Sequence, residues 1–219
     1  MSNLMTLVDS MGNDLTVVNS ARVSMSKHSD TFDDIKDRKL INYLADHNHW
    51  TPFASVIIQL RIKMPIFIAR QWFRSNIGIT RNEVSRRYVD DKPEFWYPYS
   101  WRSRPENVKQ GSGGALPRDV QDRMYAAYED MCDKAENTYN FMLAAGVCPE
   151  QARAILPQAT MTEFIETASL AAYNRIFKLR IDSHAQIEIQ EYAVMLHNII
   201  NTVAPVSWAA LTRNREYTV

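Results

Sequence analysis

The sequence has few cysteines, no excess of charge of either sign and no long hydrophobic run. Its two cysteines, Cys132 and Cys148, are too few for a disulfide framework or a cysteine-based zinc site. The 25 basic and 25 acidic side chains balance, so the chain lacks the net positive charge typical of a general nucleic-acid binder. Uncharged apolar stretches reach only about ten residues, whereas a membrane-spanning helix needs roughly 20, and residues 1–14 do not resemble a secretory leader. We therefore expect a cytoplasmic protein that binds neither membranes nor nucleic acid.

Glycine is also scarce, and the histidines are scattered. Three of the six glycines lie within residues 111–114, and neither Gly-x-Gly-x-x-Gly nor Gly-x-x-x-x-Gly-Lys occurs. This argues against a Rossmann or P-loop grip on a nucleotide, so a bound phosphate would need side chains or helix ends. His28, His47, His49, His184 and His197 show no metal-ligand spacing, and we expect no metal site.

Hydrophobic periodicity predicts mixed α and β structure. No linker or internal repeat interrupts the chain, so we expect one domain over residues 1–219. Residues 93–114 form a long polar, aromatic and finally Gly/Ser-rich stretch, which we interpret as a mobile lid or a loop ordered by a ligand. Strands are expected at 6–8, 55–64 and 84–89, whereas 162–168 is ambiguous between strand and helix. Helices are expected from Asn13 or Asp14 and at 31–46, 66–73, 116–145, 149–156 and 169–179, and finally from Asp182 or Ser183 to Pro205.

Arginine outnumbers lysine by 17 to 8, and seven of the arginines lie between Arg70 and Arg104. Two dense segments stand out there, residues 70–74 (Arg-Gln-Trp-Phe-Arg) and 82–88 (Asn-Glu-Val-Ser-Arg-Arg-Tyr). Guanidinium groups beside a serine hydroxyl and backbone amides would suit a phosphomonoester. An exposed arginine-rich hairpin explains the same pattern, so the residues alone leave both interpretations open.

A third dense segment, residues 179–186, reads Leu-Arg-Ile-Asp-Ser-His-Ala-Gln. It places Arg180 just before an expected helix start and His184 in the first turn, where a helix favours anions and neutral imidazole. An ordinary capped helix with a satisfied histidine accounts equally well for this segment.

Together these segments resemble the flavin-dependent thymidylate synthases, whose signature is Arg-His-Arg, a spacer and then Asn-Glu-x-Ser-x-Arg-Tyr. The resemblance extends over nearly the whole chain, because further blocks stand in the family's order. These are Met11-Gly-Asn-Asp-Leu, Ala21-Arg-Val-Ser24, His49-x-Thr-Pro-Phe53, the block from Pro65 to Arg74, Ala152-Arg-x-x-Leu-Pro157 and the segment 179–186.

The resemblance implies an α+β fold, a single domain with a central, largely antiparallel sheet packed by long helices. It implies reductive methylation of dUMP to dTMP, with methylenetetrahydrofolate as carbon donor, FAD as carrier and NADPH as reductant. Family members are homotetramers with shared sites. Neither Cys132 nor Cys148 lies in a charged motif that would activate a thiol, which agrees with chemistry carried by a flavin.

Carried over by position, the resemblance also assigns residues. Arg180 is the catalytic residue, against the uracil edge, where it would stabilise charge developing on the ring. The substrate-binding residues are Gln71, Arg74, Glu83, Val84, Ser85, Arg86, Arg87, Arg153 and Arg180. The cofactor-binding residues are Ser24, His49, Thr51, Arg74, Ser75, Asn76, Ile77, Ser169, Arg175 and His184.

The chain departs from the signature where Arg-His-Arg would stand, because it reads Arg74-Ser75-Asn76 and the spacer is one residue longer. Two further flavin positions, an asparagine and an arginine in the family, are Ser169 and Ala171 here, and another asparagine is Arg175. We expect Arg175 and Arg81 to compensate. Two alternatives remain open: a flavin- and folate-dependent hydroxymethylation of dUMP or dCMP, and a catalytically silent nucleotide-binding relative.

Overall fold

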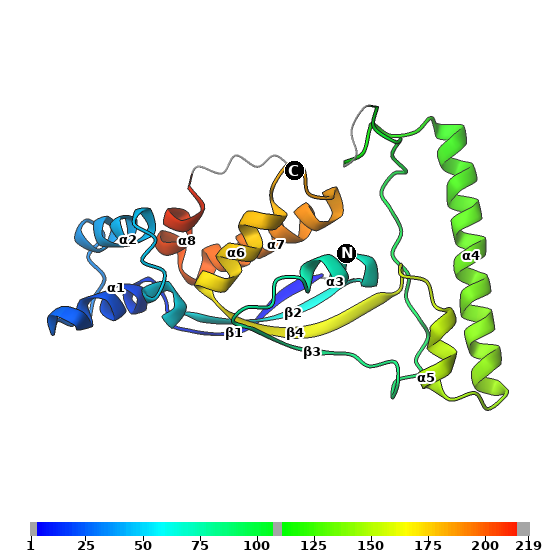
Figure 1. The fold of residues 1–219 in the computed structure, drawn as a ribbon, viewed down its shortest axis with the longest axis horizontal. Coiled ribbons are helices and arrows are strands. Elements are labelled where there is room, and N and C mark those ends of the chain that lie inside the picture. The colour runs from blue at the N-terminus through cyan, green and yellow to red at the C-terminus, as the bar shows by residue number, and fades with distance from the viewer. Residues whose placement is uncertain (1–3, 107–110, 214–219) are drawn as a thin grey trace. The chain divides into compact units, whose positions relative to one another are not determined.

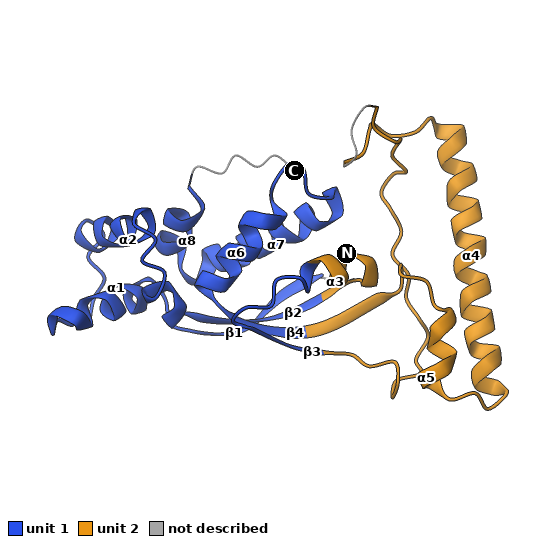
Figure 2. Ribbon diagram, viewed as in Figure 1, with its two compact units in different colours: residues 1–62, 72–82, 165–219 blue, residues 63–71, 83–164 orange. Residues whose placement is uncertain are grey.

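The structure, a computed structural model, describes residues 4–106 and 111–213. The chain divides into two compact units, shown in blue and orange in Figure 2. Unit 1 comprises residues 1–62, 72–82 and 165–219, and unit 2 comprises residues 63–71 and 83–164, each within the described ranges. Whether the units behave as the single domain expected from the sequence stays a prediction.

A four-stranded sheet has the order β1-β2-β4-β3, formed by β1 (Met5–Met11), β2 (Ile57–Pro65), β3 (Ile79–Glu83) and β4 (Met161–Ser169). Strands β1 and β2 are antiparallel, with Met5 opposite Ile62 and Met11 opposite Ile57. Alternate residues of β2 are buried, as the period of two in its sequence predicts. Together with the helices, this sheet confirms the α+β class.

The helices of unit 1 are α1 (Asp14–Arg22), α2 (Lys36–Asp46), α6 (Leu170–Arg180), α7 (Ile187–Val203) and α8 (Pro205–Thr212). Helix α6 packs against α7 and α8, α7 packs against β1, and α2 packs against α8 (Figure 1). Their core includes the fully buried Trp208 and Phe177, whose ring centroids lie 5.3 Å apart. This packing fixes α6, which carries several of the candidate residues.

Asp14 ties the N-terminal helix to the C-terminal one. Its buried carboxylate accepts hydrogen bonds from the backbone amides of Val206 at 3.0 Å and Ser207 at 2.7 Å. These amides belong to the first turn of α8, whose orphan donors and positive dipole end favour a carboxylate. These hydrogen bonds join two parts of the chain that lie more than 190 residues apart in the sequence.

In unit 2, helix α4 (Arg118–Ala144) follows a segment that hydrogen-bonds to it. Tyr125 donates its hydroxyl to the carbonyl of Pro98 at 2.7 Å, and Tyr128 donates to the carbonyl of Trp96 at 2.5 Å. Residues 107–110 of the expected lid lie outside the described residues, and its role stays a prediction. Unit 2 also holds α5 (Pro149–Ala152) and the first six residues of α3 (Ile66–Trp72).

Two expected elements need correction. The strand predicted at 84–89 is wrong: β3 occupies 79–83, and residues 86–88 form a turn closed by the bond from the Tyr88 amide to the Ser85 carbonyl. The last long helix begins at Ile187, because Asp182 instead accepts the backbone amide of His184 in a tight turn. That helix, α7, ends at Val203, just before Pro205 as expected, and Pro205 opens the separate helix α8 at its first position.

The ambiguous segment 162–168 is a strand, since it lies within β4 and every second residue is buried. Within residues 4–106 and 111–213, none of the helices combines the length and the apolar character that crossing a membrane requires.

Asn13 and Thr16 form a capping box at the start of α1, and they generate a stability prediction. The Asn13 side chain accepts the amides of Leu15 and Thr16, and the Thr16 hydroxyl accepts the Asn13 amide at 3.1 Å. We expect Asn13→Ala to lower the free energy of unfolding by about 1 kcal/mol in chemical denaturation. Asn140→Ala, at an exposed position inside α4, is the control; a comparable loss there would contradict the assignment.

Candidate functional site

Unit 2 contains a cavity of about 360 Å³ that gathers much of the arginine-rich motif. Of the residues assigned to substrate binding, Glu83, Val84, Ser85, Arg86 and Arg153 line it. Two guanidinium groups and a serine hydroxyl therefore face one small cavity. This donor set suits a singly esterified phosphate.

The polar groups of this cavity are held in place by neighbours. The Thr162 hydroxyl donates to the Glu83 carboxylate at 2.6 Å, and the Val84 amide donates to the Glu163 carbonyl at 2.9 Å. Arg86 donates to the carbonyl of Asp91 at 2.8 Å, so its guanidinium is fixed by backbone rather than by a carboxylate. Its charge consequently remains available to an anionic ligand.

Two of the assigned residues in unit 2 do not line this cavity. The Arg87 guanidinium forms an ion pair with Glu150 and lies 5.4 Å from the ring centroid of Tyr88. Gln71 belongs to α3 and is likewise not among the lining residues. Their assignment to the nucleotide stays a prediction.

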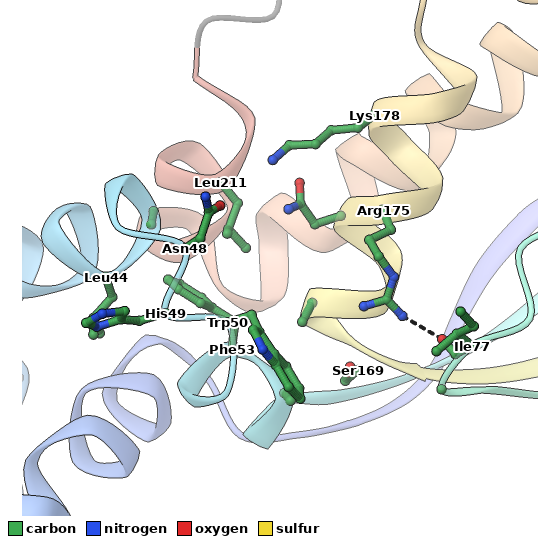
Figure 3. Close-up of a pocket in the computed structure, with 15 residues that line it drawn as sticks. Leu44, Asn48, His49, Trp50, Phe53, Ile77, Ser169, Arg175, Lys178 and Leu211 are labelled. Carbon is green, nitrogen blue, oxygen red and sulfur yellow. Dashed lines mark hydrogen bonds between the residues drawn. The ribbon is translucent and has the colours of Figure 1, made fainter.

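Unit 1 contains a cavity of about 640 Å³, walled by apolar side chains and by polar groups of α6 (Figure 3), which is called the larger cavity by comparison with that of unit 2. Of the residues assigned to the cofactor, His49, Ile77, Ser169 and Arg175 line it. Such a volume, with an apolar wall and a few polar groups, is typical of ligand and cofactor pockets. Figure 3 shows Arg175 and Lys178 extending from the same helix.

A second cavity in unit 1, of about 650 Å³, is lined by Ser24, His49 and Thr51, which are the other flavin positions of the N-terminal blocks. His49 and Trp50 line both of these cavities. Trp50 is 61% exposed, so its indole presents a large apolar face to solvent in this conformation. An aromatic side chain placed in this way suits stacking on a planar ring.

The loop that carries the altered signature lies beside the larger cavity. Ile77 and Gly78 line it, whereas Ser75 and Asn76 do not. Arg175 donates to the Ile77 carbonyl at 2.6 Å, the bond drawn as a dashed line in Figure 3. Arg175 thus lines the larger cavity, and its compensation for a lost flavin contact stays a prediction.

Arg81, the second residue expected to compensate for the lost flavin contacts, binds other groups of the protein. Its guanidinium forms an ion pair with the buried Glu166 and donates to the carbonyl of Ser75 at 2.6 Å. It is not among the residues that line the larger cavity. The expectation that Arg81 replaces a lost flavin contact therefore receives no support from its position.

Arg180 is the last residue of α6 rather than the residue before a helix, and Arg74 belongs to the same unit. Burial lowers the pKa of Arg180, and the Arg74 guanidinium lowers it further. A guanidinium is nevertheless not deprotonated in proteins, so the side chain stays cationic near neutral pH. A partly buried cation acts on a ligand more strongly than an exposed one, since solvent screens it less.

His184 lies in the turn between α6 and α7, not in a helical first turn. Its ring is largely exposed, and its Nδ1 lies 2.9 Å from the Asp182 carboxylate. It lines neither cavity of unit 1, so its contact with a flavin stays a prediction.

Neither cysteine has the setting of an activated nucleophile. Cys132 is buried on α4, and burial raises the pKa of its thiol, although hydrogen bonds with Tyr128 and Tyr97 oppose the rise. Cys148 is exposed and precedes Pro149. In the described ranges, no three or more His, Cys, Asp or Glu side chains form a group that could hold a metal ion.

Sequence reasoning missed several residues that line the larger cavity, among them Asn48, Trp50, Asn174 and Lys178. Asn174 is 8% exposed, and its Oδ1 has no hydrogen-bond partner within the described part of the chain. Helical spacing could have found Lys178, which lies three residues after Arg175 and therefore on the same side of α6.

Comparison with known proteins gives consistent matches. The family described as "Thymidylate synthase complementing protein" matches residues 6–206. A flavin-dependent thymidylate synthase of Thermosipho africanus is 37% identical over 94% of this chain and 90% of its own length. One from Thermus thermophilus is 38% identical over 93% and 73%. The crystal structure of a UMP/dUMP methylase from Streptomyces cacaoi bound with 5-Br dUMP superimposes with a TM-score of 0.85 at 27% identity, covering 95% and 94%.

Gly78, beside Ile77 in the cavity wall, has a φ of +72°, a conformation that side-chain-bearing residues rarely adopt. We expect Gly78→Ala to lower the free energy of unfolding by about 1 kcal/mol, because the chain must stay in this strained region. Gly114→Ala is the control, since Gly114 has no positive φ and no atom within 4 Å of a Cβ. Equal effects of the two substitutions in denaturant titrations would contradict the prediction.

Proposed function

Because the chain belongs to the thymidylate synthase complementing protein family, the flavin-dependent thymidylate synthases, we propose that it methylates dUMP reductively to dTMP. Membership makes it a flavoprotein and a methyltransferase of dTMP biosynthesis. The carbon donor in this proposal is methylenetetrahydrofolate and the reductant is NADPH. The observation that carries the proposal is the presence of two differently built cavities, one small and cationic, the other large and mostly apolar.

The cationic cavity of unit 2 is the proposed site of the nucleotide phosphate. Arg86 and Arg153 supply two cationic forks, and the Ser85 hydroxyl supplies a further donor. Glu83, held by the Thr162 hydroxyl, provides an acceptor for an N–H group of the nucleotide. The Streptomyces cacaoi methylase, which is similar in structure, was crystallised with 5-Br dUMP and with 5-Br UMP, and this supports a pyrimidine mononucleotide as ligand.

The larger cavity of unit 1 is the proposed site of FAD, and its lining fits such a group. The apolar wall suits a flat ring system, Arg175 and Lys178 suit a diphosphate, and the unpartnered Oδ1 of the buried Asn174 can accept a ligand N–H or O–H. When bound, FAD supplies the chemistry of one-carbon and hydride transfer. The chain supplies the binding surface, its orientation and its charge.

Arg180 has the catalytic part in this proposal. Its cationic guanidinium stabilises negative charge that develops on the pyrimidine ring during transfer, an electrostatic role like that of an oxyanion hole. The partial burial of Arg180 favours this role, because charges in a poorly hydrated site interact more strongly. The assembly in the proposal is a homotetramer, in which the arginine-rich segment of one subunit serves the flavin of another.

The reaction is tested with purified enzyme, dUMP, methylenetetrahydrofolate, FAD and NADPH, followed by mass analysis of the nucleotide. The expected product is heavier than dUMP by one methyl group in place of hydrogen. A hydroxymethylated nucleotide, or turnover of dCMP alone, would replace the proposal with the alternative chemistry. Absence of any product from a flavin-loaded enzyme would contradict both.

Arg180→Ala should lower kcat at least about a hundredfold while the thermal unfolding midpoint changes little, because the charge it supplies acts on the transition state. Arg123→Ala is the control: Arg123 is exposed and pairs only with Asp119 one turn away on α4. Turnover by Arg180→Ala at the rate of the unsubstituted enzyme would refute the assigned role.

The variant Cys132→Ala/Cys148→Ala should retain turnover, because the proposed chemistry uses no thiol nucleophile. Some loss of stability is expected from the cavity left beside Tyr128, about 1 kcal/mol. The assay is the same nucleotide mass analysis at a temperature below the unfolding transition. Loss of activity in a folded Cys148→Ala single variant would point instead to covalent catalysis by a cysteine.

A further inference from the structure

The interior of unit 1 holds a charged group that the proposed reaction does not use. Glu166, in the middle of β4, is fully buried, and its carboxylate accepts the indole N–H of Trp72 at 3.1 and 3.2 Å. Its other partner is the guanidinium of Arg81, on β3. Burial raises the pKa of Glu166, while the Arg81 charge and these hydrogen bonds oppose the rise. A charge in such a place is costly unless its partners are fixed.

Arg81 does more than neutralise Glu166. Its Nε bonds to the carboxylate, while a terminal nitrogen donates to the backbone carbonyl of Ser75 at 2.6 Å. Its guanidinium carbon also lies 4.9 Å from the ring centroid of Phe73. The planar side chain of Arg81, on β3, therefore contacts Glu166 in β4 and the residues before and after Arg74, Phe73 and Ser75. A lysine could not make all these contacts.

A second arginine holds the same loop at its other end. Arg175, on α6, donates to the Ile77 carbonyl at 2.6 Å. The loop formed by residues 73–78 is thus fastened by guanidinium groups at the carbonyls of Ser75 and Ile77. Ser75 is itself one of these points and Asn76 lies between them, and these two residues replace the histidine and arginine of the signature. Ile77 and Gly78, at the end of the loop, form part of the wall of the larger cavity.

We infer that Glu166 and Arg81 are positioning residues for the flavin site, which they build by holding the loop 73–78 through the carbonyl of Ser75. Arg81 touches neither the cavity nor its ligand, and Glu166 acts only through Arg81. The inference rests on the proposed function, because it takes FAD as the occupant of the larger cavity. It explains why a buried carboxylate is retained in β4 at a position that an apolar side chain could fill.

Two substitutions separate this role from a contribution to stability alone. Arg81→Lys keeps a positive charge for Glu166 but cannot also reach the Ser75 carbonyl, and Glu166→Gln keeps the size and the acceptor for Trp72 but leaves Arg81 without its counter-charge. The matched control is Tyr173→Phe, which removes a hydroxyl bonded to the Glu166 carbonyl at 3.3 Å in the same buried region, without touching the loop.

The measurement is the dissociation constant of FAD, titrated by flavin fluorescence into the full-length, flavin-depleted protein. Visible circular dichroism of the bound flavin and the KM for dUMP are recorded alongside. We expect Arg81→Lys and Glu166→Gln to weaken FAD binding about tenfold, to change the flavin dichroism and, because Arg74 lies in the same loop, to raise the KM for dUMP as well. Tyr173→Phe should lower the unfolding midpoint and leave FAD affinity and dichroism unchanged.

Unchanged FAD affinity in a folded Arg81→Lys variant would overturn the inference, even if Glu166→Gln fails to fold. The same holds if Tyr173→Phe weakens FAD as much as Arg81→Lys does, because stability alone would then explain the effect. If the unsubstituted protein does not bind FAD, the proposed function fails and the inference fails with it, a result distinct from the other two.

Discussion

The contact between Glu166 and Arg81 constrains how the neighbouring elements of unit 1 fit together. Removing a carboxylate from water costs several kcal/mol after relaxation, so the surrounding residues must supply partners in fixed positions. Here β3 provides the guanidinium and the end of α3 provides the indole of Trp72. The pairing of Arg81 with Glu166 fixes the register of these elements, since a shift by one residue would turn one of the charges away. The loop between α3 and β3 is held in place by the same contact, because Arg81 also donates to the Ser75 carbonyl.

This contact also shows where prediction from sequence stops. The strand β2 was predictable because apolar and polar residues alternate along it. The strand β3 was not, because its residues show no alternation of apolar and polar side chains, and Arg81 is covered through its partner Glu166 in β4. Apolar and polar residues also alternate over residues 84–89, but this segment forms no strand and residues 86–88 form a turn. Periodicity detects hydrophobic faces, and it does not detect a face completed by an ion pair between distant strands.

The candidate site divides in the same way. Residues of the signature motif could be named from the sequence, and Glu83, Ser85, Arg86 and Arg153 do line one cavity. The sequence could not show which partner each arginine contacts in the folded structure. Arg81 and Arg175 carry the same charge, yet one is held by a buried carboxylate and the other lies in a cavity wall. Which arginine meets a ligand depends on its neighbours in space, and Asn174 is a further example, since nothing in its local sequence marks it.

The capping of α8 by Asp14 has a consequence for the order in which the protein can form during synthesis. The amides of Val206 and Ser207, which the Asp14 carboxylate accepts, are made more than 190 residues after Asp14 during translation. Until then its carboxylate can only be hydrated, which keeps the start of α1 from settling into the core. Contacts of such long sequence separation slow folding, because a large loop must close before they form. We therefore expect the contact between α1 and α8 to form only after α8 has been synthesised.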